Sequence, residues 1–166
     1  MAKTFLALGS NLGDRMGYLR RAALALPGPV RCSRVYETVP IDAPEGSGQF
    51  LNAVVEIDFE ADISELLALV NRLETLANRE RLEPNASRTL DVDVIFVKGM
   101  TSDDPEMTIP HPRCRERAFV VAPLSDLDSS LAKFLNPEMA RLIAISRERE
   151  DAEVFPGVVI YGEALC

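Results

Sequence analysis

The chain contains no tryptophan and a single histidine, and only 6% of its 166 residues are aromatic. One histidine excludes any metal site that needs several histidine ligands. The three cysteines, Cys32, Cys114 and Cys166, are odd in number, far apart and free of a Cys-x-x-Cys pattern. That spacing argues against a zinc site and against a disulfide framework. Counting alone leaves a Cys/His catalytic pair open, although no neighbouring sequence supports one.

Long apolar runs and excess positive charge are also missing. No stretch approaches the roughly 18 apolar residues that a membrane-spanning helix requires, and the apolar stretch at the N-terminus is too short for a signal peptide. The 26 acidic residues outnumber the 18 lysines and arginines, which gives a net charge of −8. Such an acidic surface repels nucleic acid and anionic membranes. We expect a cytoplasmic protein that binds neither of them, and we expect it to be a monomer.

Apolar and polar residues alternate in patterns that predict both strands and helices. With 47% apolar residues, the chain is long enough for one buried core and too short for two, so we expect residues 1–166 to form one domain. Helical periodicity predicts one helix capped by Asp14 or Asn11 and a second capped by Asp62. The expected strands lie at 4–8, 30–38, 50–59 and 91–97, and the expected helices end near residue 25 and near residues 78–81.

The order β-α-β-β-α-β is typical of an α+β fold of the ferredoxin-like, split βαβ type. We expect a four-stranded, mainly antiparallel sheet with helices packed on one face. The C-terminal third adds helices at about 115–124 and 137–147 and a short strand near 158–161. Two polar loops, 39–49 and 82–87, are expected at one end of the sheet.

Two carboxylates stand at the start of the last of these strands. Side chains alternate along a strand, so Asp91 and Asp93 point to the same face, roughly 6.5–7 Å apart along the backbone. Covering two acids on an otherwise apolar strand is costly unless a cation or a solvent-filled cleft receives them. This spacing suits two Mg²⁺ ions, which lie about 3.5–4 Å apart in two-metal sites. Taken alone, the pair also fits an exposed strand edge.

The positive charges that the chain does have are concentrated around these acids. Eight of the 18 lysines and arginines lie between residues 72 and 117: Arg72, Arg79, Arg81, Arg88, Lys98, Arg113, Arg115 and Arg117. Arginine's planar fork suits phosphate oxygens, so the cluster favours a small polyanion with its own metal. His111 lies between Pro110 and Pro112, which restrict the backbone and so aim the imidazole. A solvated basic turn explains that segment equally well when it is considered by itself.

Five segments together resemble a known family, the 6-hydroxymethyl-7,8-dihydropterin pyrophosphokinases of folate biosynthesis. They lie in family order and span roughly residues 5–127. The Arg-Thr-Leu-Asp-x-Asp and Pro-His-Pro segments are the most specific, whereas the glycine-containing segment is not a Walker P-loop because it lacks Gly-Lys-Ser/Thr. The segments are Ala7-Leu8-Gly9-Ser10-Asn11-Leu12-Gly13-Asp14, Ser33-Arg34-Val35-Tyr36-Glu37-Thr38, Phe50-Leu51-Asn52-Ala53, Arg88-Thr89-Leu90-Asp91-Val92-Asp93, and Ile109-Pro110-His111-Pro112 through Arg117-Ala118-Phe119.

The resemblance implies transfer of pyrophosphate from ATP to the hydroxymethyl oxygen of the pterin, with release of AMP. By motif, Asp91 and Asp93 would hold two Mg²⁺ ions on the triphosphate. The groups implied to neutralise phosphate charge are Arg79, Arg81, Arg88, His111 and Arg117, of which Arg79 and Arg88 would be catalytic. The groups implied to face the nucleotide are Asn71, Glu74 and Thr108.

The resemblance also implies a pterin site. Phe50 and Phe119 would sandwich the ring and Asn52 would hydrogen-bond its edge, while backbone groups of Thr38, Val39 and Ile41 would contact the same ring. A flat heteroaromatic ring suits an aromatic side chain on each face and polar groups at its rim. Pyrophosphate transfer asks mainly for positioning and charge stabilisation, so metal ions and arginines are the expected equipment.

One segment departs from the family pattern. Family members commonly carry Arg-Trp-Gly-Pro-Arg-Thr before the acidic pair, with the tryptophan on a lid over ATP. Here residues 82–89 read Leu-Glu-Pro-Asn-Ala-Ser-Arg-Thr, one residue shorter and without tryptophan. The altered lid supports an alternative, a non-catalytic or altered-specificity relative that binds pterin or nucleotide on the same fold. A third reading, an RNA-binding domain, lacks the basic and aromatic strand signature and has the wrong net charge.

Overall fold

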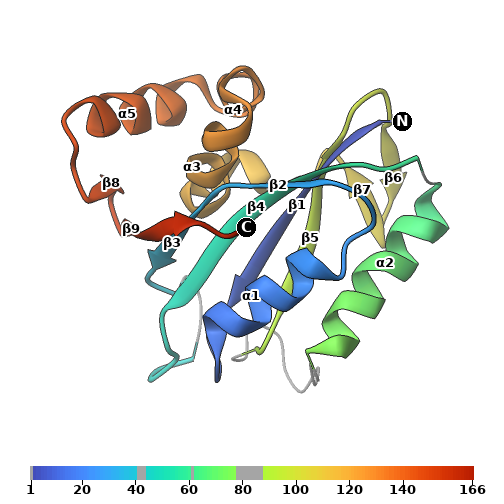
Figure 1. Cartoon of the computed structure of the whole chain (residues 1–166). Coiled ribbons are helices and arrows are strands. Elements are labelled where there is room, and N and C mark those ends of the chain that lie inside the picture. The colour runs from blue at the N-terminus through green and yellow to red at the C-terminus, as the bar shows by residue number, and fades with distance from the viewer. Residues whose placement is uncertain (1, 41–43, 61, 78–87) are drawn as a thin grey trace.

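A seven-stranded antiparallel sheet runs through the computed structural model, which describes residues 2–40, 44–60, 62–77 and 88–166. The strand order is β5-β1-β4-β3-β9-β8, and β2 also pairs with β4 (Figure 1). The strands of this sheet are β1 (Lys3–Ser10), β2 (Val30–Cys32), β3 (Arg34–Thr38), β4 (Phe50–Asp58), β5 (Asp91–Val97), β8 (Glu153–Phe155) and β9 (Val158–Ala164). The four strands expected from the sequence are adjacent in it, which is consistent with a split βαβ arrangement. The α+β class and the antiparallel sheet are confirmed, but the sheet is larger than expected.

Helices cover both faces of the sheet (Figure 1). They are α1 (Arg15–Leu24), α2 (Ile63–Leu76), α3 (Ala118–Leu127), α4 (Ser129–Leu135) and α5 (Pro137–Glu148). On one face α1 and α2 bury Leu8 and Val55 of the sheet. On the other, α3, α4 and α5 bury Phe5 and Val54. The two helices of the split βαβ unit therefore share one face, as expected. The added C-terminal helices cover the other face, where burial of the apolar α3 segment contributes roughly 1.5–3 kcal/mol per valine or leucine.

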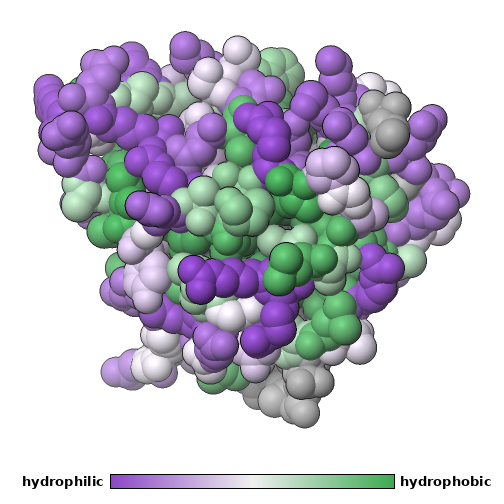
Figure 2. Space-filling view, in the orientation of Figure 1, coloured by the Kyte–Doolittle hydropathy of each residue, from purple (hydrophilic) through white to green (hydrophobic). Residues whose placement is uncertain are grey.

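The first two helices begin where the sequence predicted. The Asp14 carboxylate accepts a hydrogen bond from the Gly17 N–H (3.1 Å) and caps α1. Asp62 and Glu65 form a reciprocal capping box at the start of α2, with both bonds at 2.9 Å. Figure 2 shows apolar surface between polar groups on the side where these two helices lie. Leu24 and Leu76 are the exposed large apolar residues of α1 and α2.

The strand predicted at 30–38 is divided at Ser33. The Ser33 N–H donates to the Val54 carbonyl (2.9 Å), and the Val54 N–H donates to the Ser33 hydroxyl (2.8 Å) rather than to a backbone carbonyl. The Ser33 carbonyl is left to accept from the Leu165 N–H (3.0 Å). A serine side chain therefore replaces one ladder bond, and β2 and β3 continue on either side of it.

Several short elements of the C-terminal half were not predicted. Between β5 and the one-turn helix η1 (Cys114–Glu116) lies a hairpin of β6 (Ser102–Asp104) and β7 (Met107–Ile109). Helix α4 follows α3 directly, capped by Asp128, whose carboxylate accepts from the Leu131 N–H (2.9 Å). Segments of three to seven residues are too short for hydrophobic periodicity to reveal them.

Cys32 and Cys166 form a disulfide bond, with their Cα atoms 5.5 Å apart. The bond joins the end of the chain to β2, next to the Leu165–Ser33 backbone contact. The expectation that the cysteines form no disulfide is therefore wrong for this pair, because the approach of β9 to β3 brings together residues 134 apart in sequence. Within the part of the chain that the structure describes, no helix is long and apolar enough to cross a membrane.

Candidate active site

Asp91 and Asp93 lie at the point where two cavities meet. Both carboxylates belong to β5, the edge strand of the sheet, and alternation places them on the same face of that strand. One cavity has a volume of about 460 Å³ and the other of about 290 Å³, and both aspartates line both of them. Two separate molecules can therefore approach the same carboxylate pair from different sides.

The larger cavity lies between α2, β5 and the β6–β7 hairpin. It gathers the side chains expected to face a nucleotide, namely Asn71, Glu74, Thr108 and His111. The backbone N–H of His111 donates to the Ile95 carbonyl (2.9 Å), which fixes the backbone of this residue against β5. The Nδ1 atom of His111 accepts from the Arg113 N–H (3.2 Å), so in the neutral ring Nε2 carries the hydrogen. Nε2 lies 3.9 Å from Asp93 Oδ1.

The smaller cavity gathers the residues expected to hold the pterin. They are Thr38, Val39, Phe50, Asn52 and Phe119. The Asn52 amide donates to the Thr38 hydroxyl (2.8 Å), which orients its Oδ1. Gly9 of β1 lies beside them, and a Cβ atom there would be 3.1 Å from Asn52 Oδ1 and 3.6 Å from the Phe50 ring. A side chain at position 9 would therefore require Asn52 to shift by a few tenths of an ångström.

Positive groups flank the two carboxylates. The Arg88 guanidinium donates to Asp91 Oδ2 (2.9 Å), and the Arg117 guanidinium lies 3.5 Å from Asp93 Oδ2. Burial raises the pKa of Asp93 above its ordinary value and the charge of Asp91 raises it further, while His111 and Arg117 oppose the shift. Burial lowers the pKa of His111, with Asp93 acting in the opposite direction. His111 is therefore a neutral hydrogen-bond donor near neutral pH.

The donor set at this junction fits magnesium. Among the described residues, no group of three or more histidine, cysteine, aspartate or glutamate side chains gathers to form a complete protein site. Mg²⁺ commonly binds through one or two carboxylates and takes its other ligands from substrate phosphates and water. Asp91 and Asp93 supply the two carboxylates, and their mutual repulsion is the energy that a divalent cation would relieve.

Three expected site residues, Ile41, Arg79 and Arg81, lie outside the described residues, as does the altered lid at 82–87. Cys114 lines neither cavity. Its side chain is buried, and burial raises the pKa of its thiol. A neutral, buried thiol is a poor nucleophile, so the structure offers no support for a Cys/His catalytic pair.

Sequence reasoning missed two supporting contacts. The Glu74 carboxylate is buried and accepts from the Val92 N–H (3.1 Å), so it holds the edge of β5 between the two aspartates. Asn11 contacts the backbone of Arg88, which is 77 residues away in sequence. Asn11 belongs to a recognised segment and Glu74 was expected to face the nucleotide, but no local pattern shows which distant backbone group a side chain meets.

A carboxylate pair between two cavities, flanked by arginines, is the arrangement of an enzyme that transfers a phosphoryl group from one bound molecule to another. Comparison with known proteins identifies the family of phosphoryl-transfer enzymes to which the chain belongs. The model of the 7,8-dihydro-6-hydroxymethylpterin-pyrophosphokinase (HPPK) family matches residues 5–129. The chain belongs to this family.

Relatives from distant bacteria agree with the assignment. The chain is 37% identical over 134 residues to the 2-amino-4-hydroxy-6-hydroxymethyldihydropteridine pyrophosphokinase of Bacillus subtilis, covering 78% of this chain and 80% of that protein. It is 38% identical over 165 residues to the Mycobacterium leprae enzyme of the same name, covering 92% and 86%.

Solved structures share the fold at low sequence identity. Plasmodium falciparum HPPK-DHPS crystallised with pteroate gives a TM-score of 0.61 at 15% identity, covering 90% of this chain and 44% of that one. An HPPK-DHPS structure in complex with substrates gives 0.62 at 12% identity, covering 95% and 48%. The chain spans less than half of these longer proteins.

Proposed function

We propose that this chain transfers pyrophosphate from ATP to the hydroxymethyl oxygen of 6-hydroxymethyl-7,8-dihydropterin and releases AMP, as a step of folate biosynthesis. The chain is an ATP-dependent pterin pyrophosphokinase by its family. The observation that carries the assignment of the site is the position of Asp91 and Asp93, which line both cavities. ATP occupies the cavity beside α2 and the pterin occupies the cavity beside Phe119.

The residues around each cavity have distinct tasks in this scheme. Phe50 and Phe119 stack on the pterin ring, and Asn52, oriented by Thr38, hydrogen-bonds its edge. Backbone groups of Val39 contact the same ring, and those of Ile41, outside the described residues, would do so by the family motif. On the nucleotide side, Asn71, Glu74 and Thr108 face ATP.

Charge stabilisation comes from the groups that surround the transferred pyrophosphate. Arg88 and Arg117 hold its oxygens, and the Nε2–H of His111 donates a further hydrogen bond. Arg79 and Arg81, which lie outside the described residues, would add to this charge by the family motif. Asp91 and Asp93 would hold two Mg²⁺ ions, which would neutralise charge on the triphosphate. The pterin oxygen forms a bond to the β-phosphorus, the bond from that phosphorus to the α-phosphate oxygen breaks, and AMP leaves with that oxygen while the hydroxyl proton passes to solvent.

An omission assay tests the proposal. Purified protein is incubated with ATP, Mg²⁺ and 6-hydroxymethyl-7,8-dihydropterin, and AMP is measured by chromatography beside three mixtures that each lack one component. We expect AMP only in the complete mixture. If calorimetry shows that both substrates bind but no AMP forms over hours, catalysis is refuted and a binding module is favoured. If AMP forms only when 6-hydroxymethyl-7,8-dihydropterin is replaced by another pterin alcohol, the specificity is altered.

The monomeric state, the cytoplasmic location, the single domain over 1–166 and the absence of nucleic-acid or membrane partners stay predictions from the sequence. Residues 82–87 lack the tryptophan of the family lid. We predict that this shorter lid closes less tightly over ATP and that turnover is slower as a result.

A further inference from the structure

Asn11 holds the backbone of Arg88 on both sides. The residue directly follows β1 and is 7% exposed. Its backbone N–H donates to the Arg88 carbonyl (3.1 Å), and its side-chain Oδ1 accepts from the Arg88 N–H (2.7 Å). Both polar backbone groups of Arg88 are therefore fixed by one residue. From this position the Arg88 side chain reaches Asp91.

The other end of the same amide holds the segment that leads to the pterin cavity. Asn11 Nδ2 donates to the Gly48 carbonyl (3.2 Å). The approach is close, because a Cβ atom on Gly48 would lie 3.1 Å from the Asn11 carbonyl oxygen. Two residues after Gly48 the chain reaches Phe50, which lines the pterin cavity. Asn11 thus stands between a group on the phosphate side and a group on the pterin side.

The chemistry of a primary amide fits this place. Asn11 must accept from one backbone N–H and donate to one backbone carbonyl, at opposite ends of a short side chain. An aspartate keeps the acceptor and loses the donor, and an alanine loses both. The three groups are far apart in sequence, so no local turn explains the arrangement.

We propose that Asn11 is a positioning residue. It sets the distance between Arg88 and residues 48–50, the segment that leads from Gly48 to Phe50 in the pterin cavity. The proposal rests on the proposed function, because Asn11 acts through residues assigned there to the phosphates and the pterin. It predicts that the two ends of the amide contribute to different kinetic parameters. The Oδ1 atom, which binds the Arg88 backbone, supports kcat. The Nδ2 atom, which binds the Gly48 carbonyl, supports a low KM for the pterin.

Three variants separate the two ends. Asn11→Ala removes both, and since a misplacement of about 1 Å can cost about 100-fold in rate, we expect kcat to fall by roughly 10–100-fold and the pterin KM to rise. Asn11→Asp keeps the acceptor for Arg88 and places an oxygen against the Gly48 carbonyl, so the pterin KM rises while kcat stays within about threefold of wild type. Gly48→Ala adds no charge but crowds the backbone carbonyl oxygen of Asn11, so it pushes Gly48 away from the Asn11 amide and should raise the pterin KM as Asn11→Asp does.

A stability control and a structural readout accompany the kinetics. Asp62→Ala removes the α2 capping box at the end of the helix remote from Glu74, which should lower the thermal midpoint by about 2–4 °C and leave kcat and KM unchanged. Hydrogen exchange by mass spectrometry should show faster exchange at Arg88 in Asn11→Ala but not in Asn11→Asp. In both variants, exchange in peptides covering 44–50 should be faster.

The outcomes separate this proposal from the proposed function. If wild type makes AMP and a folded Asn11→Ala keeps kcat within twofold, the positioning role is overturned while the function stands. If Asp62→Ala loses as much kcat as Asn11→Ala, general destabilisation explains the effect and the role is again overturned. If wild type makes no AMP, the function fails, and unchanged exchange at Arg88 in Asn11→Ala would overturn the positioning role independently.

Discussion

At the scale of single residues, the site contains two neighbouring carboxylates whose charges repel each other and so oppose folding. Asp91 and Asp93 stand side by side on one strand, and burial and mutual repulsion raise the pKa of Asp93. A carboxyl whose pKa is raised in the folded state contributes stability below its unfolded pKa and loses it as pH rises through the folded value. Ionisation of the Asp93 carboxyl therefore opposes folding, and a bound cation would offset that cost.

Replacing one of these acids should separate function from stability. In Asp93→Asn, which keeps the shape and removes the charge, we expect pyrophosphate transfer to be lost. We also expect the thermal midpoint without Mg²⁺ to rise by about 2 °C, since the one-third exposed side chain is partly screened by solvent. Differential scanning calorimetry with and without Mg²⁺ measures both states. Added Mg²⁺ and an ATP analogue should stabilise wild type more than the variant; equal stabilisation would contradict a metal role for Asp93.

The polar residues that line the two cavities were largely predictable from the sequence, whereas the contacts that hold them in place were not. Asp91, Asp93 and His111 stand out because their types are costly or rare in their surroundings and their spacing is short. Gly9 and Asn11 belong to a recognisable segment. However, Gly9 is close to Asn52 and Asn11 bonds to Gly48 only in the folded chain, so the sequence does not show what either residue contacts. Contacts that depend on sheet register and on loop paths leave no periodic signal.

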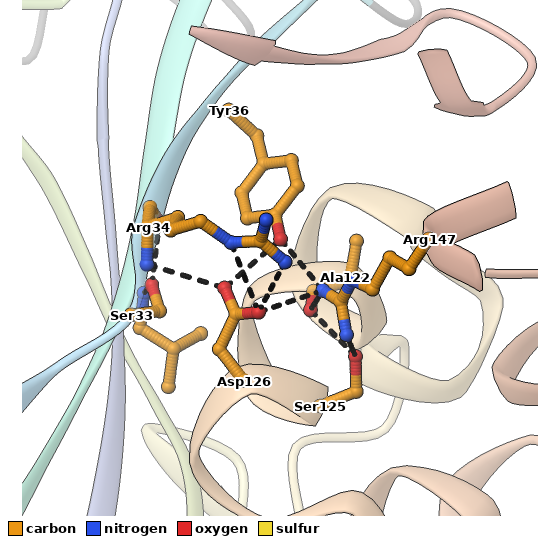
Figure 3. A network of polar contacts seen from close by, with 8 residues as sticks. Ser33, Arg34, Tyr36, Ala122, Ser125, Asp126 and Arg147 are labelled. Carbon is orange, nitrogen blue, oxygen red and sulfur yellow. Dashed lines mark hydrogen bonds and ion pairs between the residues drawn. The ribbon is translucent and has the colours of Figure 1, made fainter. Parts of the chain in front are cut away.

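At the scale of elements, a polar network joins the sheet to the C-terminal helices (Figure 3). Asp126 of α3 lies between Arg34 of β3 and Arg147 of α5, with guanidinium contacts at 2.9 and 3.0 Å. The Tyr36 hydroxyl donates to Asp126 (2.9 Å) and accepts from Arg147 (2.6 Å). Burial, with the charge of Asp126, raises the pKa of Tyr36 to about 12, so the hydroxyl stays protonated. One carboxylate therefore ties three elements together.

Removing that carboxylate should cost more than removing an exposed one. Asp126→Ala leaves two guanidinium groups without their shared partner. Breaking a fully buried pair costs about 3–5 kcal/mol, and because the Arg34 side chain is 37% exposed we expect a loss of about 2–3 kcal/mol here. Glu138→Ala is the matched control, because Glu138 is 75% exposed and pairs with Arg141 within one helix, a contact worth about 0.5 kcal/mol. Urea unfolding of both variants measures the difference. A loss in Asp126→Ala no larger than in the control would show that the network does not stabilise the fold.

Elements were predictable where the pattern is long and local. α2, with its capping box and apolar stripe, begins as expected, and β5 was predicted at 91–97. β2 and β3 were merged because the division depends on the Ser33 hydroxyl binding Val54 of another strand. α4 was missed because seven residues give too few turns to show a stripe.

At the scale of the whole molecule, the C-terminal third both covers the second face of the sheet and closes the chain onto β2. β9 pairs with β3, which ends at Thr38 in the pterin cavity. The disulfide between Cys32 and Cys166 fastens this closure. A disulfide is unusual in a reducing cytoplasm. The structure therefore predicts an oxidised cysteine pair, whereas the expected cytoplasmic location predicts a reduced one.

Thiol titration decides between them. In protein denatured without reductant, we expect one reactive thiol, that of Cys114, and three after reduction. A cross-link that closes a loop of more than 100 residues typically contributes about 2–4 kcal/mol, so reduction should lower the thermal midpoint by roughly 5–15 °C. Cys166→Ser is the control, because its thermal midpoint should not respond to reductant. Three reactive thiols in the unreduced, denatured protein would show an open pair, and the stability of the C-terminal closure would then rest on the β3–β9 pairing and the Asp126 network.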